Sequence, residues 1–200
     1  MPESKLSSII KKGGIAVIPT DTIYGMVGSA LIPETVKRIY KLRKRNLKKP
    51  LIILISNLND LEKFNIQISL EEKVFLKKIW PNPISVILPV PPAYRQARSH
   101  KWNYLHRGTN SLAFRIPKLL SLRNLLRQTG PLVAPSANLE GEKPAITIDE
   151  AKKYFGNQVD FYLDGGKIES EPSTLVELNS GRIKVLRNGL FKVTAGYIDP

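Results

Sequence analysis

The sequence contains no cysteine and only two histidines, His100 and His106. The absence of thiols excludes disulfides, cysteine nucleophiles and cysteine-ligated zinc, and two histidines are too few for most transition-metal sites. No apolar run approaches the roughly 20 residues that a membrane span needs. Residues 1–12 also lack the long apolar stretch and the small-residue cleavage pattern of a secretory signal. We therefore expect a cytoplasmic protein without a redox, zinc or membrane role.

Several common catalytic motifs are missing as well. The chain has no GxxxxGK[ST] phosphate loop, no GxGxxG dinucleotide loop, no GxSxG nucleophile elbow and no HExxH zinc-protease helix. Each of those activities depends on the local geometry that its motif provides. The sequence therefore gives no support to these four classes of function.

Negative charge is also in short supply. The 200 residues contain 31 lysines and arginines against 17 aspartates and glutamates, which is a formal net charge of +14. Such an excess concentrates phosphates and nucleic acids near a protein. The alternative is a lysine-rich surface that serves only solubility. The length suits one substantial core, so we expect a single domain over residues 1–200.

The hydrophobic pattern alternates strand-like and helix-like segments. A β-prone run at residues 15–18 follows a short amphipathic helix that ends at Gly13, and Pro33 suits the start of a second helix. Residues 20–25 are typical of a polar turn. Residues 91–110 are basic and rich in turn-forming residues, which is typical of a mobile surface loop. We expect further strands at 51–55, 84–88, 112–116, 132–134, 161–163, 175–178 and 183–186, and further helices at 70–79, 119–127 and 149–155.

This alternation predicts an α/β domain with a twisted, mostly parallel or mixed open sheet that is flanked by helices. Cations and small polar groups gather at the ends of the expected elements. They predict a concave cationic cleft at the strand ends. The candidates are Thr20, Thr22, Arg43, Arg45, Lys49, Arg115, Ser136, Asn138, Ser173, Thr174 and Arg187.

Arg43 and Arg115 stand out among these candidates. Arg43 extends the apolar stripe of the helix that starts at Pro33. Arg115 interrupts an apolar strand, where a charge needs a partner or an anionic ligand. Other candidates also have ordinary structural interpretations. Residues 41–49 could be a solvated basic run, and the polar side chains at 19–22 and 135–138 could form turns or helix caps.

Eight short segments follow one another along nearly the whole chain and carry most of these polar residues. They are PTDTIYGMVG (19–28), IYKLRKRNLKKPLIIL (39–54), WPNPISVIL (80–88), SLAFRIP (111–117), APSAN (134–138), LDGG (163–166), PSTLVEL (172–178) and VLRNG (185–189). In this order they resemble the signature of the YrdC family of threonylcarbamoyl-AMP synthases. The shared order of eight motifs is far more specific than any one motif.

The resemblance implies a function. Members of that family combine L-threonine, bicarbonate and ATP into threonylcarbamoyl-adenylate and pyrophosphate, the first step of N6-threonylcarbamoyladenosine (t6A) synthesis in tRNA. It thus implies a nucleotidyltransferase of the short, single-domain form, with Mg²⁺ carried by ATP rather than by protein side chains. It also implies a downstream threonylcarbamoyl-transferase complex as partner. Because the basic residues are not interleaved with aromatics, we expect tRNA binding to be at most weak and non-specific.

The same resemblance assigns the site residues. Arg43, Arg45, Ser136 and Asn138 match the tetrad that surrounds the nucleotide, and we expect them to be catalytic. The further residues expected at ATP are Lys49, Ser111 and Arg187, and those expected at threonine are Thr22, Arg115, Ala134 and Ser173.

The chain departs from the family pattern at several positions. Arg43 stands where lysine is usual, which keeps the charge and changes its geometry. Pro144 stands where an ATP-contacting serine is common, and proline has no hydroxyl to make that contact. The other departures are Asn46 for proline, Ser85 for threonine and Glu140 for serine.

The chemistry that the resemblance implies suits the available residue types. A carbamate oxygen attacks the α-phosphorus and pyrophosphate leaves, so the protein needs positioning and cations rather than a covalent nucleophile. Two alternatives remain. One is an RNA-binding branch of the same fold without synthase activity, although Arg45, Ser136 and Asn138 argue against it. The other is a carbamoyl-transfer domain like that of hydrogenase maturation factors, which lies in much longer chains.

Overall fold

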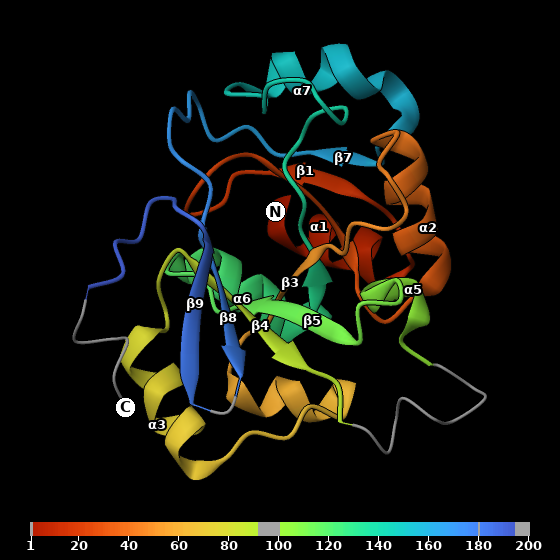
Figure 1. Ribbon diagram of the computed structural model, residues 1–200. Helices are drawn as coiled ribbons and strands as arrows, with labels where there is room; N and C mark the ends of the chain where they lie inside the picture. Colours follow the sequence, from red (N-terminus) through yellow and green to blue (C-terminus); the bar gives the residue numbers. More distant parts are fainter. Residues whose placement is uncertain (1, 92–100, 180, 195–200) are drawn as a thin grey trace.

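The computed structural model describes residues 2–91, 101–179 and 181–194. Its strands form one mixed sheet in the order β7-β1-β2-β6-β3-β5-β4-β8-β9 (Figure 1). The pairs β1–β7, β3–β5 and β4–β8 are parallel, and the other neighbours are antiparallel. The strands are β1 (Ala16–Ile18), β2 (Gly25–Ser29), β3 (Ile52–Leu54), β4 (Ile84–Pro89), β5 (Ser111–Arg115), β6 (Leu132–Val133), β7 (Phe161–Tyr162), β8 (Thr174–Asn179) and β9 (Arg182–Arg187).

The helices begin where local rules favour a start. Pro33 lies in the first turn of α2, where its missing N–H has no helical partner to lose. Ser69 and Glu72 form a reciprocal capping box at α3. Within the described chain, no helix is both long and apolar enough to cross a membrane. The helices are α1 (Pro2–Lys11), α2 (Pro33–Leu42), the 3₁₀ helix η1 (Leu58–Phe64), α3 (Leu70–Ile79), α5 (Asn103–His106), α6 (Leu120–Thr129), α7 (Ile148–Phe155) and the 3₁₀ helix η2 (Gly156–Gln158).

Alternation along β5 separates the core from the open face of the sheet. Leu112 and Phe114 are buried, and the Phe114 ring lies 5.2 Å from that of Phe64 in η1. Ala113 and Arg115 point to the opposite face, because successive strand side chains alternate. Helices α1 and α6 cover that face as far as Leu54 of β3. The neighbouring part of the face, over β5, β4 and β8, forms the floor of a cavity.

The strands and helices predicted by residue range are confirmed, with ends that differ by at most two residues. The sheet is mixed rather than mostly parallel. Several strands that are consecutive in the chain pair directly with each other, as β1–β2, β4–β5 and β8–β9 do, and each of these pairs is antiparallel.

One strand was missed. The polar turn predicted at residues 20–25 ends too late, because Gly25 begins β2. Glycine is disfavoured in strands, so Gly25 and Gly28 obscured the pattern. In the structure, a Cβ at Gly28 would lie only 2.5 Å from Cγ2 of Thr35. Glycine therefore allows α2 to approach β2 closely.

The surface loop predicted at residues 91–110 is wrong for residues 102–106, while residues 92–100 lie outside the described residues. The short helix α5 occupies part of this segment, and Trp102 and Leu105 are buried. The ring of Trp102 lies 5.1 Å from that of Phe64. The turn-forming residues of this segment do not indicate a packed helix, because tertiary packing of Trp102 rather than local propensity holds the segment in place.

Candidate active site

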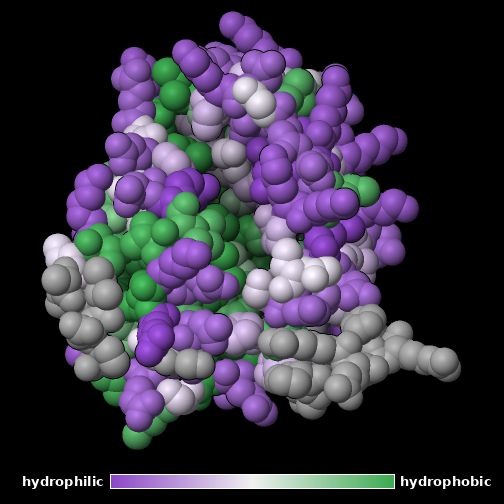
Figure 2. Space-filling view, viewed as in Figure 1, coloured by the Kyte–Doolittle hydropathy of each residue, from purple (hydrophilic) through white to green (hydrophobic). Residues whose placement is uncertain are grey.

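A cavity of about 290 Å³ lies on the open part of the sheet. Figure 2 shows the face of the molecule hollowed near its centre, between hydrophobic and hydrophilic side chains. Three arginines line the cavity, and none of its described lining residues is acidic. The polar lining comes from elements far apart in the sequence: Thr22 after β1, Arg45 after α2, Arg115 in β5, Ser136 after β6, Ser173 before β8 and Arg187 in β9.

Arg115 anchors one end of the cavity. Its side chain is only 5% exposed, and Nη2 lies 3.3 Å from Oδ1 of Asp21. Nη1 donates to Oγ1 of Thr22 at 3.2 Å. Asp21 also accepts a hydrogen bond from the backbone N–H of Lys118 at 2.8 Å, which fixes the carboxylate. Burial lowers the pKa of Arg115 and the Asp21 carboxylate opposes that shift. The fold therefore holds Arg115 as a buried, paired cation.

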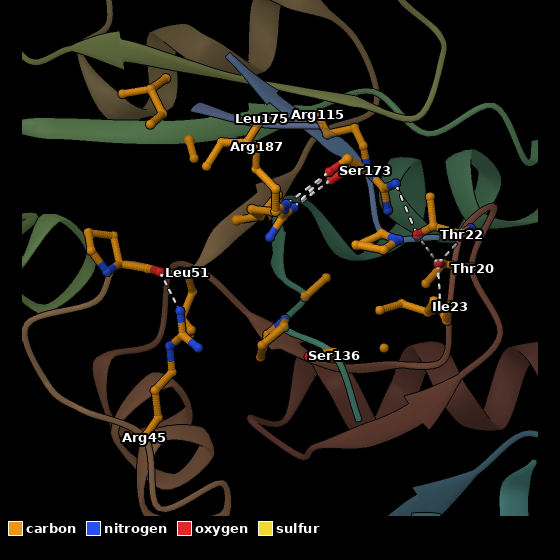
Figure 3. Close-up of a pocket in the computed structure, with 18 of the residues that line it drawn as sticks. Thr20, Thr22, Ile23, Arg45, Leu51, Arg115, Ser136, Ser173, Leu175 and Arg187 are labelled. Atoms are coloured by element: carbon orange, nitrogen blue, oxygen red, sulfur yellow. Dashed lines mark hydrogen bonds between the residues drawn. The ribbon is translucent and has the colours of Figure 1, made fainter. Parts of the chain in front are cut away.

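Ser173 and Arg187 form the adjoining wall. Oγ of Ser173 lies 2.9 Å from Oγ of Ser85, which is fully buried. Arg187 donates to the Ser173 carbonyl from Nη2 at 2.8 Å and from Nε at 3.3 Å. Burial, and next the positive charge of Arg45, lower the pKa of Arg187. Figure 3 shows Arg45 and Thr22 on opposite sides of the cavity, with Arg187 and Ser173 between them.

Arg43 is brought next to Ser136 and Asn138, as the family resemblance implies, but it lies beneath the cavity rather than in its lining. It is 2% exposed, and Nη2 donates to Oγ of Ser136 at 3.2 Å and to Oδ1 of Asn138 at 3.0 Å. Burial, and next the neighbouring Arg45, lower its pKa to about 10, so it stays charged at neutral pH. Arg43 therefore braces the loop that carries Ser136.

Asn138 is committed to the same structural network. Besides accepting from Arg43, its Nδ2 donates to the carbonyls of Leu139 at 2.7 Å and Glu142 at 2.8 Å. Those bonds occupy the amide fully within the fold. Like Arg43, it does not line the cavity.

Lys49 is paired instead of facing the cavity. Its Nζ lies 2.6 Å from Oε1 of Glu140, and the lysine side chain is 59% exposed. The other oxygen of Glu140 accepts from the backbone N–H of Asn46. The Lys49 hydrogen bond, then that from Asn46, lower the pKa of Glu140. This carboxylate thus ties the basic loop after α2 to the loop that follows Ser136.

The structure separates the predicted site residues into two groups. The roles assigned to them stay predictions, as does the cationic cleft, which the three lining arginines support. Arg43, Lys49 and Asn138 lie outside the lining. The predicted residues that line the cavity are Thr22, Arg45, Ser111, Arg115, Ala134, Ser136, Ser173 and Arg187.

Sequence reasoning missed the partners of these residues. Asp21 was treated as part of an ordinary turn, and Ser85 only as a substituted position. The need of a buried Arg115 for a counter-charge was the signal that could have found Asp21. Thr109, which also lines the cavity, carried no sequence signal.

The fold and the cavity define a class: an open-faced α/β protein whose cleft offers arginines and hydroxyls to a small anionic ligand. Among the described residues, no group of three or more His, Asp or Glu side chains could hold a metal ion. A family model that covers Sua5, YciO and YrdC, with the description "Telomere recombination", matches residues 8–189. The chain belongs to the Sua5/YciO/YrdC family.

Individual relatives agree with this assignment. A Methanocaldococcus jannaschii protein that bears the name threonylcarbamoyl-AMP synthase is 30% identical over 189 residues, which are 94% of this chain and 86% of the relative. A structure of Pyrococcus abyssi Sua5 with L-threonine is 27% identical, with a TM-score of 0.80 over 94% of this chain. The chain spans about half of that protein, 54%. Escherichia coli YciO, at 22% identity and a TM-score of 0.80 over 96% of this chain and 90% of its own, shows the fold alone.

Proposed function

We propose that the protein is a threonylcarbamoyl-AMP synthase, which converts L-threonine, bicarbonate and ATP to threonylcarbamoyl-adenylate and pyrophosphate. The observation that carries the proposal is one cavity with a buried arginine, Arg115, at one end and Arg45 at the other, without an acidic lining residue among those described. The names of the relatives and the threonine in the Pyrococcus abyssi structure add to its support.

Threonine would bind at the Arg115 end. Arg115 is suited to pair with its carboxylate, because a guanidinium offers two parallel N–H groups to two oxygens. The hydroxyls of Thr22 and Ser173 and the backbone at Ala134 line the same region and would hold the amine and the side chain. Asp21 would keep Arg115 in place while the substrate binds.

ATP would bind toward Arg45. Arg45, Arg187, Ser111 and Ser136 line that part of the cavity and are the expected phosphate and ribose contacts. Arg43 and Asn138 would act as positioning residues beneath Ser136. Because the described lining holds no carboxylate, Mg²⁺ would arrive on the phosphate oxygens. There it would neutralise part of the charge on the triphosphate.

The reaction needs two bond-forming steps. The threonine amine first attacks the carbon of bicarbonate, and a carbamate forms as water leaves. A carbamate oxygen then bonds to the α-phosphorus of ATP while the bond to the bridging oxygen breaks, and pyrophosphate departs with the electron pair. Fixed cations offset the repulsion between the anionic carbamate and the anionic nucleotide. Arg45 and Arg187 would supply these cations.

The product would pass to a downstream threonylcarbamoyl-transferase complex that modifies tRNA, and both steps belong in the cytoplasm, where ATP and tRNA are found. Direct tRNA binding by this protein should be weak, independent of sequence and steeply reduced by salt.

The test is pyrophosphate release from Mg-ATP by the purified protein. We expect release only when L-threonine and bicarbonate are both present, together with an adenylate whose mass matches threonylcarbamoyl-AMP. Release that ignores threonine, or no release from a folded protein, would refute the proposal. Reactions without threonine, and reactions in buffer freed of carbon dioxide, are the matched controls.

A further inference from the structure

Arg107 is not among the residues that line the cavity, and it has no part in the function proposed above. It follows α5 directly and stands two residues before Thr109, which lines the cavity. Its guanidinium carbon lies 4.2 Å from the centre of the Tyr40 ring. Tyr40 belongs to α2, the helix that leads into Arg45. The segment before β5 therefore meets the segment that carries Arg45 at this contact.

Arg107 and Arg45 are both linked to Tyr40, the first by stacking and the second through a shared carbonyl. Oη of Tyr40 donates to the Lys49 carbonyl at 2.9 Å, and Nε of Arg45 donates to that carbonyl at 3.3 Å. Burial raises the pKa of Tyr40, while a hydrogen bond from Arg107 and then the positive charges of Arg107 and Arg45 oppose the shift. Among the described residues, neither arginine has a carboxylate partner. Two guanidinium groups thus lie around one tyrosine without a carboxylate that compensates their charges.

The backbone at Arg107 is strained. Its φ is 52°, in the left-handed region that glycine prefers at the end of a helix. Glycine is the next residue, Gly108, so the sequence places an arginine at a position where glycine would be unstrained. Moreover, Nε of Arg107 is buried without a hydrogen bond to a described residue. Strain retained at a charged side chain indicates a use for that side chain.

We propose that Arg107, together with Arg45, binds the terminal phosphates of a polyphosphate at the rim of the cavity. The inference rests on the proposed function, in which the polyphosphate is ATP and then the departing pyrophosphate. Stacking on Tyr40 fixes the orientation of the planar guanidinium, so that the N–H groups not bonded to Tyr40 can donate in its plane. A polyvalent anion between the two arginines would remove their mutual repulsion. Arg107 would then contact the leaving group, which gains charge as the α-phosphorus bond breaks.

The test measures the binding of pyrophosphate, ATP and AMP by calorimetry, without catalysis. R107Q should lower the affinity for pyrophosphate and for ATP about tenfold, as expected for the loss of one charged hydrogen bond. It should lower the affinity for AMP less than about twofold. K101Q is the matched control, because Lys101 lies in the same segment but stacks on another ring, with Nζ 4.8 Å from the centre of Trp102. It should leave all three affinities unchanged.

A second variant separates binding from structure. R107G removes the Tyr40 contact but also relieves the left-handed strain, so its unfolding midpoint should stay within about 4 °C of the original value. Its pyrophosphate affinity should fall as in R107Q. A large drop in the midpoint with unchanged pyrophosphate affinity would show that Arg107 is structural and overturn the proposal. An equal loss of affinity for AMP and for pyrophosphate would overturn the proposal as well.

The outcome is distinguishable from failure of the proposed function. If the protein releases no threonine-dependent pyrophosphate but R107Q still loses pyrophosphate affinity, the polyphosphate site stands and the synthase proposal fails. If synthase activity is found and both Arg107 variants bind pyrophosphate normally, the site fails and the synthase proposal stands.

Discussion

The two ends of the cavity hold their cations in different ways. At one end Arg115 is 5% exposed and is paired with Asp21 and Thr22. At the other end Arg45 has no carboxylate partner among the described residues, and the nearby Lys49, outside the lining, is 59% exposed in its pair with Glu140. The interaction within a buried pair is screened little by salt, whereas the interactions of exposed cations are screened strongly. The proposed threonine end therefore depends on fixed geometry, and the proposed nucleotide end on accumulated charge.

The largest effect is expected at the buried end. Arg115→Leu should lower the free energy of unfolding by about 3 kcal/mol, because it leaves Asp21 buried without its counter-charge. It should also raise the KM for threonine far more than that for ATP. Urea unfolding and separate substrate titrations measure the two effects. The double variant R115L/D21N should regain part of the stability without regaining threonine affinity. An effect confined to ATP would show that the ligand is assigned to the wrong end.

Arg45→Ala tests the open end. We expect the fold to remain intact, because the side chain of Arg45 donates only to the carbonyls of Lys49 and Pro50 among the described residues. The loss of a charged hydrogen bond of about 1.5 to 3 kcal/mol should lower kcat/KM for ATP roughly ten- to a hundredfold. The exposed Lys41 on α2 gives the control variant, Lys41→Ala, which should change little. Unchanged ATP kinetics in folded Arg45→Ala would remove Arg45 from the nucleotide site.

Ser85→Ala should have a moderate effect that sharpens the threonine end. It removes the hydroxyl that lies 2.9 Å from Oγ of Ser173, a buried hydrogen bond worth about 1 kcal/mol. The KM for threonine should rise about fivefold and that for ATP should not change. Ser85→Thr keeps the hydroxyl and should retain threonine affinity. Equal changes in both constants would indicate a general loss of structure.

The smallest effect is expected at Glu140. Its carboxylate competes with phosphate for Lys49, so Glu140→Gln should free the lysine and lower the KM for ATP, by less than about fivefold because exposed pairs are weak. Since its contacts with Lys49 and Asn46 lower the pKa of Glu140, the pair is present throughout the neutral range. A rise in the KM for ATP, measured by steady-state titration, would mean that Glu140 orders the loop instead of restraining Lys49.

The sequence predicted the elements better than it predicted the contacts. Apolar runs specify strands such as β4 and β5 because burial on a sheet dominates there. The strand β2 was not predicted because the close approach of α2 requires Gly28, and no local sequence pattern reveals such a tertiary constraint. Arg115 was found from its conflict with an apolar strand, but its partner Asp21 lies 94 residues earlier in the chain. The pairing of Lys49 with Glu140 likewise depends on two loops that only the fold brings together.

Calorimetric titration of L-threonine, with and without saturating pyrophosphate, tests the division of the cavity most directly. If the two ends are separate sites, both ligands bind together, and the Kd for threonine stays within about threefold of its value in the absence of pyrophosphate. Raising the salt concentration should weaken the binding of pyrophosphate strongly and the binding of threonine little. If pyrophosphate abolishes threonine binding, the two ligands share one site and the division into a threonine end and a nucleotide end is wrong.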